Sequence, residues 1–262
     1  MAYTTIDKPT DYFETILYTG NGSTLNVGGL DFTQDFTWIK NRGDTTSHFL
    51  YDTVRGAGND KDLRSNSTGA EGSGDGATHG FMSAFRSDGF TVNQGSSTAS
   101  ITNANTNTYA SWNWKAGTSF TNDASSTSVG TIDSTGSVSD TAGFSIVSYT
   151  GTGSAGTIKH GLNSTPSTII LKNRIDGSIF WYMYHKSLGN NTELYLNGTD
   201  AAPSSTSAWN TTSPTSSVFS VGSHGGTNAS GEATIAYVFA EKKGYSKFGS
   251  YTGNGNADGT FV

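Results

Sequence analysis

The sequence lacks cysteine and carries few charges. None of its 262 residues is a cysteine, so the chain cannot form disulfides or cysteine-ligated metal sites. Charged residues make up only 14% of the chain, below the typical ~25% of soluble domains. The formal net charge of −6 gives no general attraction to nucleic acid or to an anionic membrane surface. We therefore expect no nucleic-acid partner.

Long apolar runs and helical periodicity are missing as well. No apolar run approaches the ~18 residues that a membrane-spanning helix needs, so we expect no membrane insertion. The opening residues MAYTT show neither the basic nor the apolar region of a secretory signal peptide. No window sustains apolar residues at the i, i+3, i+4 spacing of an amphipathic helix.

Aromatic residues and glycine are abundant instead. The chain has 34 Gly, 14 Phe, 12 Tyr and 5 Trp. Disordered segments are poor in aromatic residues, so this composition argues against disorder. It is typical of many short strands joined by polar turns, with aromatic side chains filling thin cores. The composition predicts an all-β protein.

An internal repeat organises the chain. The phrase YTGNG at residues 18–22 recurs as YTGTG at 149–153 and again as YTGNG at 251–255. Five landmarks follow the first two copies in the same order, which predicts an array of related modules. The matched landmarks are 38–42 with 170–174, 51–56 with 184–189, 90–92 with 219–221, Asn103-Ala104 with Asn228-Ala229, and Trp112 and Trp114 with Tyr237 and Phe239.

The repeat divides the chain into five segments. We expect two antiparallel β-sandwich modules, which superpose landmark on landmark. Between them, a linker rich in Ser, Thr and Gly should be the first segment cut by protease, leaving two folded fragments. The segments are a leader at 1–15, a first module at 16–117, a linker at 118–142, a second module at 143–245, and the start of a truncated third module or a C-terminal strand at 246–262.

Matched apolar positions predict the two cores. A residue that is apolar in both copies is expected to face the inside of its module, and we expect these side chains to be mostly buried. We also expect His160 to sit in a turn, with its ring bonded to the backbone. The predicted core residues are Trp38, Ile170, Phe90, Phe219, Trp114 and Phe239.

With these landmarks aligned, the chain resembles a family of repeat-containing structural proteins of tailed phages, abundant in marine viruses. Members carry concanavalin A-like (jelly-roll) β-sandwich modules, so the resemblance implies tandem sandwiches of that type. It covers essentially the whole chain, and it transfers no catalytic residues. The phrases that carry it are 8–13 (KPTDYF), 38–42 (WIKNR), 52–56 (DTVRG), 160–162 (HGL) with Pro166, 184–186 (YHK) and 244–248 (GYSKF).

Two groups of residues are candidates for ligand binding. Lys40 and Arg42 occupy alternate positions of one predicted strand, and Lys172 and Arg174 occupy the same positions of its copy. They either form a basic stripe for an acidic glycan or a neighbouring subunit, or a solvated face with cross-strand partners. Trp209 and Asn210 make the second group, in a polar loop without an evident counterpart in the first module.

Other chemistry finds little support in the sequence. The five histidines show no metal-ligand spacing, so we expect no metal and no cofactor. No nucleophile elbow or phosphate-binding loop is present. A glycosidase needs two carboxylates that face each other. No acid pair repeats between the modules, so we do not expect an enzyme.

The sequence and the resemblance together predict a non-enzymatic virion protein. It would be made in the host cytoplasm and displayed on the virion surface, as a fibre or adhesin module that binds host surface glycan. Its partners would be other virion proteins and copies of itself, as a homo-oligomer. Two rival functions stay open, which are a purely structural capsid-decoration or tail-spacer protein and a glycan-cleaving tailspike.

Overall fold

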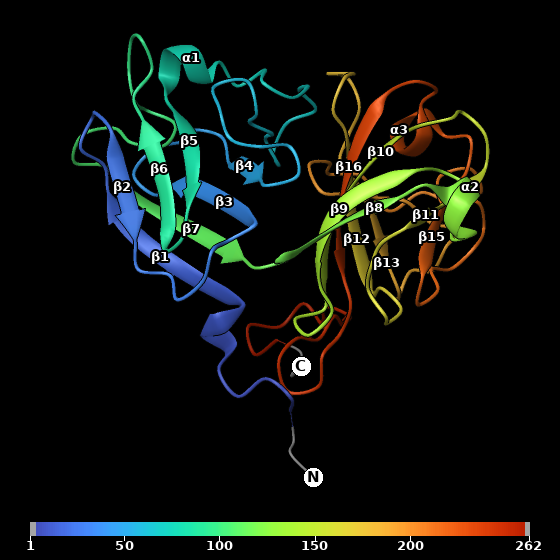
Figure 1. The fold of residues 1–262 in the computed structure, drawn as a ribbon. Coiled ribbons are helices and arrows are strands. Elements are labelled where there is room, and N and C mark those ends of the chain that lie inside the picture. The colour runs from blue at the N-terminus through green and yellow to red at the C-terminus, as the bar shows by residue number, and fades with distance from the viewer. Residues whose placement is uncertain (1–3, 260–262) are drawn as a thin grey trace.

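A computed structural model describes residues 4–259, and over this range the chain is almost entirely β-structure. The strands form antiparallel sheets that lie in two bodies side by side (Figure 1). The helical elements within these residues are one 3₁₀ turn and three single-turn helices: η1 (Pro9–Asp11), α1 (Gly76–His79), α2 (Ala124–Thr127) and α3 (Gly225–Asn228). The predicted all-β architecture of packed antiparallel sheets is confirmed, while its jelly-roll and concanavalin A-like character stays a prediction.

The first module is a sandwich of a four-stranded and a three-stranded sheet. The larger sheet has the order β1-β7-β3-β4 and the smaller one the order β2-β6-β5. Alternate side chains of both sheets meet in a core that contains Phe90 and Tyr109. The strands are β1 (Phe13–Thr19), β2 (Leu25–Gly28), β3 (Phe36–Asn41), β4 (Phe49–Asp52), β5 (Phe81–Arg86), β6 (Gly89–Asn93) and β7 (Thr108–Trp114).

The second module repeats this plan and extends it. Its large sheet has seven strands in the order β14-β13-β12-β16-β10-β9-β8, and β11 and β15 form the small sheet. Phe219 and Trp209 lie in the core. The strands are β8 (Thr118–Asn122), β9 (Ser134–Ser139), β10 (Phe144–Thr150), β11 (Gly156–Lys159), β12 (Thr168–Asn173), β13 (Tyr182–His185), β14 (Leu194–Tyr195), β15 (Val218–Val221) and β16 (Ala233–Phe239).

The repeated phrase performs the same task in both modules. The Tyr18 hydroxyl donates to the Thr102 carbonyl at 2.7 Å, and the hydroxyl of its copy Tyr149 donates to the carbonyl of Thr227. Gly20 lies so close to the chain that an added Cβ would stand 2.2 Å from the Ala104 carbonyl oxygen, and Gly151 meets the Ala229 carbonyl at the same distance. Both glycines are therefore required by close backbone approach.

The asparagine landmark closes the same turn in each copy. Asn103 accepts a hydrogen bond from the Asn21 backbone N–H at 2.9 Å, and Asn228 accepts one from that of Thr152 at 2.8 Å. Strand registers agree too, since Trp114 lies opposite Phe13 in β1 and its copy Phe239 lies opposite Phe144 in β10. The landmarks thus match in space as they do in sequence.

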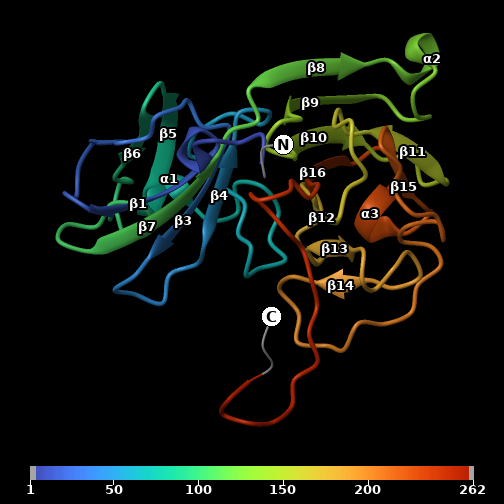
Figure 2. The ribbon, with the colours of Figure 1, turned by 90° about the horizontal axis from the view of Figure 1, so that it is seen from below.

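The expected linker at 118–142 is wrong as a free connection. Strands β8 and β9 lie within it and extend the large sheet of the second module beyond β10 (Figure 2). Asn122 helps to close the hairpin, because its side chain donates to the Val129 carbonyl at 2.8 Å. A backbone ladder of small residues holds this segment without many apolar anchors.

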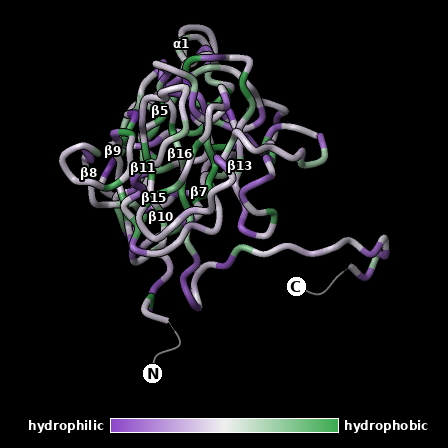
Figure 3. Tube along the Cα trace, turned by 90° about the vertical axis from the view of Figure 1, so that its right-hand side faces the viewer, coloured by the Kyte–Doolittle hydropathy of each residue, from purple (hydrophilic) through white to green (hydrophobic). Residues whose placement is uncertain are grey.

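The chain ends also differ from the expected boundaries. The strand β1 begins at Phe13, inside the segment expected to be a leader. The expected C-terminal strand is not formed within the described residues, because 249–259 contain no strand and are fully exposed. This stretch runs away from the body in Figure 3. The residue just before this stretch folds back onto the second module, since the Phe248 and Phe239 ring centroids lie 5.7 Å apart. Residues 260–262 lie outside the described range.

A third core joins the two modules. Phe36 of β3 stacks on Tyr237 of β16 with 4.2 Å between ring centroids, and Trp181 stacks on the other side of this cluster at 6.4 Å from Tyr237. The modules are therefore fused by an apolar interface rather than tethered by a linker. Of the predicted core residues, Phe90 and Phe219 are fully buried. The other four are only partly buried: Trp38, Ile170, Trp114 and Phe239.

A buried polar network lies beside this interface. Arg55 Nε donates to Asp52 Oδ2 at 2.6 Å, and both side chains are fully buried. The Tyr237 hydroxyl of the other module donates to the same Asp52 oxygen at 2.8 Å. Arg174 of the second module reaches Glu71 of the first at 2.6 Å, and Glu71 also accepts from Arg55 at 3.0 Å. Ionic contacts therefore connect the modules at the rim of their shared core.

We expect Arg55→Ala to lower the free energy of unfolding by about 3–5 kcal/mol, because it leaves the buried Asp52 carboxylate without its partner. Urea denaturation measures this change. The matched control is Arg42→Ala, since Arg42 is exposed and lies outside the network, and it should shift stability by less than about 0.5 kcal/mol. Equal effects of both variants would contradict the network.

Limited proteolysis should remove the exposed stretch at 249–259 before it cuts anywhere in 118–142. The first stretch has no backbone ladder, whereas the second is held by β8 and β9. Mass spectrometry of timed digests identifies the first cut. Early cleavage inside 118–142, with release of two folded halves, would show that the shared core does not hold the modules together.

Candidate functional site

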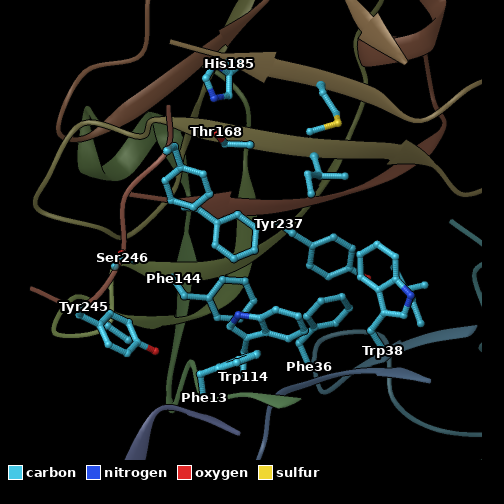
Figure 4. Close-up of a pocket in the computed structure, with 17 residues that line it drawn as sticks. Phe13, Phe36, Trp38, Trp114, Phe144, Thr168, His185, Tyr237, Tyr245 and Ser246 are labelled. Carbon is cyan, nitrogen blue, oxygen red and sulfur yellow. The ribbon is translucent and has the colours of Figure 1, made fainter. Parts of the chain in front are cut away.

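A cleft of about 430 Å³ opens between the two modules, and aromatic side chains line most of it (Figure 4). One wall comes from β1, β3 and β7 of the first module, and the other from β10, β12, β13 and β16 of the second. The start of the C-terminal segment adds a third side. The lining residues are Phe13, Phe36, Trp38, Leu50, Trp114, Ala142, Gly143, Phe144, Thr168, Ile170, Met183, His185, Tyr237, Phe239, Tyr245, Ser246 and Phe248.

Strand register explains why these rings gather. In a sheet, residues directly opposite each other on neighbouring strands point to the same face. Trp114 lies opposite Phe13 on one side and Phe36 on the other, so three aromatic rings form a row across the first sheet. Phe144 and Phe239 pair in the same way in the second module. The two matching faces meet each other, and the cleft lies between them.

A second hollow of about 300 Å³ adjoins the cleft on the first module. It is lined by Trp38, Trp112, Trp114 and His48, and it shares Trp38 and Trp114 with the cleft. The three tryptophans are partly exposed, and the Trp38 and Trp112 rings stand nearly perpendicular, with centroids 6.4 Å apart. We call this group, with its histidine, the tryptophan platform.

A hydrogen bond fixes the histidine of the platform. Trp38 Nε1 donates to His48 Nδ1 at 2.9 Å, so the neutral ring carries its hydrogen on Nε2. Burial lowers the pKa of His48 below its ordinary value, and the nearby Lys40 lowers it further. The neutral tautomer therefore prevails at neutral pH and presents one N–H donor beside the tryptophan faces.

Polar groups are few in the cleft. The lining residues with polar side chains are Thr168, His185, Tyr245 and Ser246, whereas the hydroxyl of Tyr237 is buried against Asp52. Over residues 4–259, none of the cleft-lining side chains is a carboxylate. The arrangement therefore favours a ligand that stacks on rings and makes a small number of hydrogen bonds.

Both predicted lysines bond backbone carbonyls of their own module. Lys40 donates to the carbonyls of Asp44 and Thr46 at 2.9 and 2.7 Å. Lys172 donates to the Ile179 carbonyl at 2.8 Å, and burial lowers its pKa to about 8. Each lysine bonds the loop that follows its own strand, which explains why it recurs in both modules.

The predicted arginines take different positions. Arg174 is engaged with Glu71 across the module interface, with Nη2 and Nε at 2.6 and 2.8 Å from the same carboxylate oxygen. Arg42 is exposed. Three of the four basic residues thus make structural contacts of their own: Lys40, Lys172 and Arg174.

The predicted ligand residue Trp209 lies in the core of the second module rather than on a surface. Trp209 is only 1% exposed and packs edge-to-face against Tyr184, with ring centroids 5.8 Å apart. Asn210 beside it is exposed, with a left-handed φ of 51°. The polar neighbours of Trp209 suggested an exposed loop, but the backbone reverses there and places the ring in the core of the second module.

Of the tryptophan platform, the sequence predicts only Trp38 and Trp114 as core residues, because their copies Ile170 and Phe239 are apolar. Both instead face the second module rather than the inside of their own. Repeat matching shows that a residue and its copy hold equivalent positions. It does not show that two sheet faces, from different modules, meet and leave part of each open.

Two further features concern residues 4–259. No group of three His, Asp or Glu side chains in this range could hold a metal ion. None of its helices is long and apolar enough to cross a membrane.

A protein-family model described as a domain of unknown function (DUF7483) matches residues 8–262 of the chain. No curated protein and no solved structure matches the chain. The match spans both modules and the interface between them, so the paired arrangement falls within one family unit.

We expect a pH-dependent change in tryptophan emission that depends on His48. Protonation adds a hydrogen to Nδ1 and removes the acceptor of Trp38 Nε1. Because the pKa of His48 is lowered, the change should occur below pH 6.5. Fluorescence titration of the wild type minus that of His48→Gln isolates this step. A midpoint above 6.5, or a step that persists in the variant, would rule out this pairing.

Proposed function

The chain belongs to the DUF7483 family, and we propose that it is a non-catalytic module of a virus particle that binds host surface glycan. The observation that carries the binding proposal is the tryptophan platform, which leaves three indole rings partly exposed beside the cleft between the modules. The faces of pyranose rings are apolar and stack on such rings, while their hydroxyls accept or donate at the rim.

The platform is held in place for this task. Trp38 and Trp112 lie opposite each other on adjacent strands, and Trp38 is further held by its bond to His48. Side chains fixed on strands lose little conformational entropy on binding. The His48 Nε2–H is the donor that a bound sugar would meet beside the platform.

The virion part of the proposal is supported by the resemblance to repeat-containing structural proteins of tailed phages. In this proposal the protein is made in the host cytoplasm and displayed on the particle surface, next to other virion proteins. The rigid union of two sandwiches through a shared core suits a projecting element. It would suit a spacer or decoration protein as well, so binding has to be tested directly.

The absence of a carboxylate among the described cleft residues supports a binding role over a glycan-cleaving one. Hydrolysis of a glycosidic bond normally needs two acids about 5–10 Å apart across the sugar. Asp52 and Glu71 lie near the interface, but both are engaged with arginines.

Trp112→Ala should weaken binding of host surface polysaccharide at least tenfold. The ring contributes stacking area to the platform, and removal of a hot-spot aromatic typically costs about 2 kcal/mol or more. Calorimetric titration with purified host polysaccharide measures the affinity, and the thermal melt checks folding. The matched control is Trp209→Phe, a buried tryptophan of the other module, which should bind like the wild type.

Three results would contradict the proposal in different ways. No binding by the wild type would favour a purely structural role. Equal loss in Trp112→Ala and Trp209→Phe would place the site elsewhere. Release of reducing sugar, abolished by one carboxylate substitution, would identify a glycan-cleaving tailspike.

A further inference from the structure

The two large sheets end in four edge strands, and three of them are short, covered or polar. β14 has only two residues. β4 is bridged by Leu63, which exchanges two backbone hydrogen bonds with Leu50. β8 has the sequence TSFTN, in which only Phe120 is apolar. Natural proteins protect sheet edges in such ways, because an open edge pairs with other chains.

The fourth edge, β1, has none of these protections. It has seven residues with the sequence FETILYT, which contains neither lysine nor proline. Exposure alternates along the strand, and Leu17, next to its central residue, is 63% exposed. Within residues 4–259, β7 is the only strand that pairs with it. A long apolar edge of this kind is a strong candidate for strand pairing between molecules.

The hydrogen-bond pattern shows which backbone groups of β1 point away from β7. Bonds from Lys115 N–H to the Tyr12 carbonyl and from Gly20 N–H to the Asn107 carbonyl bracket the ladder between β1 and β7. In an antiparallel ladder the bonded residues alternate. The even-numbered residues therefore pair with β7, and the outward N–H and C=O groups belong to Phe13, Thr15, Leu17 and Thr19.

The second module shows what fits at this edge. Its strand β10 matches β1 residue for residue, and it pairs with β16 on one side and with β9 on the other (Figure 2). Ile146 and Ser148, which match Thr15 and Leu17, lie opposite Ser137 and Thr135 of β9. The same strand position thus accepts an antiparallel neighbour, and in the first module this place is open.

We propose that β1 pairs with β1 of a second copy of this chain across a two-fold axis near Leu17. Antiparallel self-pairing places the two Leu17 side chains on the same face and close to each other, so the patch complements itself. The covered counterpart Ser148 is polar, whereas the uncovered position is leucine, as expected if two leucines cover each other. The two Glu14 carboxylates then lie toward opposite ends of the paired strands, without mutual repulsion.

The pairing joins two four-stranded sheets into one continuous sheet. Leu17, Thr15 and Phe13 lie on the face that also carries Trp112 and Trp114, because β1 and β7 pair in that register. The dimer would therefore place its two tryptophan platforms on the same face of one sheet. A surface ligand with repeated units could contact both, although the dimer itself does not rest on glycan binding.

Sedimentation velocity over a concentration series tests the proposal. The wild type should be a dimer, and Leu17→Lys should raise the dimer dissociation constant at least tenfold, because two like charges then face each other. Thr15→Pro should do the same, since it removes an outward N–H and none that bonds β7. The control is Leu188→Lys, which charges a leucine that is 44% exposed in a turn, and it should stay dimeric. Melting temperatures near that of the wild type confirm that the variants fold.

Cross-linking gives a second, independent measurement. Because the chain has no cysteine, Leu17→Cys places one thiol at the proposed axis and should form a disulfide-linked dimer under mild oxidation. Leu188→Cys should stay largely monomeric on a denaturing gel. A wild type that is monomeric at the highest concentration would overturn the proposal. So would a dimer that Leu188→Lys disrupts and Leu17→Lys does not.

Discussion

Tyr237 connects the two modules with both parts of its side chain. Its ring stacks on Phe36 of the first module at 4.2 Å, and its hydroxyl donates to Asp52 of that module at 2.8 Å. Asp52 is in turn held by the buried Arg55. The stack contributes apolar burial without fixing direction, while the hydroxyl and the ion pair are directional. Together they fix the angle at which the two sheets face each other.

The candidate site follows from this constraint. Two aromatic faces that met over their whole area would leave no cleft, and two unconnected modules would leave no defined one. With Tyr237 and Asp52 joined at one place, Trp114 contacts the second module through Phe144 and Phe239. Trp38 and Trp112 stay partly open beside it. The buried ion pair thus serves the binding surface indirectly, by setting how far the modules overlap.

Repeat matching predicted much of the fold, and it did so for a physical reason. Some residues make contacts only inside their own module, so their copies make the same contacts and the sequence repeats them. These pairs are Tyr18 and Tyr149, Gly20 and Gly151, and Asn103 and Asn228. His160 was likewise expected in a turn, and its ring does bond the backbone at Leu162 and Thr215. Contacts made within one repeat leave a repeated signal.

Contacts that have no counterpart in the other module leave no such signal. Backbone bonds hold β9 to β10 and β8 to β9, so their Ser- and Gly-rich sequence looks like a linker. Trp209 lies in the core because the chain reverses beside it, and the polar residues around it in the sequence do not predict that reversal. The prediction that Trp38 and Trp114 face the inside of their own module is wrong, because both lie on the other face of that sheet, against the core shared with the second module.

The places where the two copies disagree are therefore informative. In the aligned segments 51–56 and 184–189, Asp52 corresponds to His185 and Arg55 to Leu188. Asp52 and Arg55 are buried against the second module, whereas His185 lines the cleft and Leu188 is exposed. An interface between two unlike halves of a repeat needs complementary residues, not identical ones, so one copy supplies the charges and the other supplies Tyr237. The same reasoning applies to Leu17 and Ser148. The positions that diverge are those where a module meets something other than itself, and on β1 the structure leaves that place open.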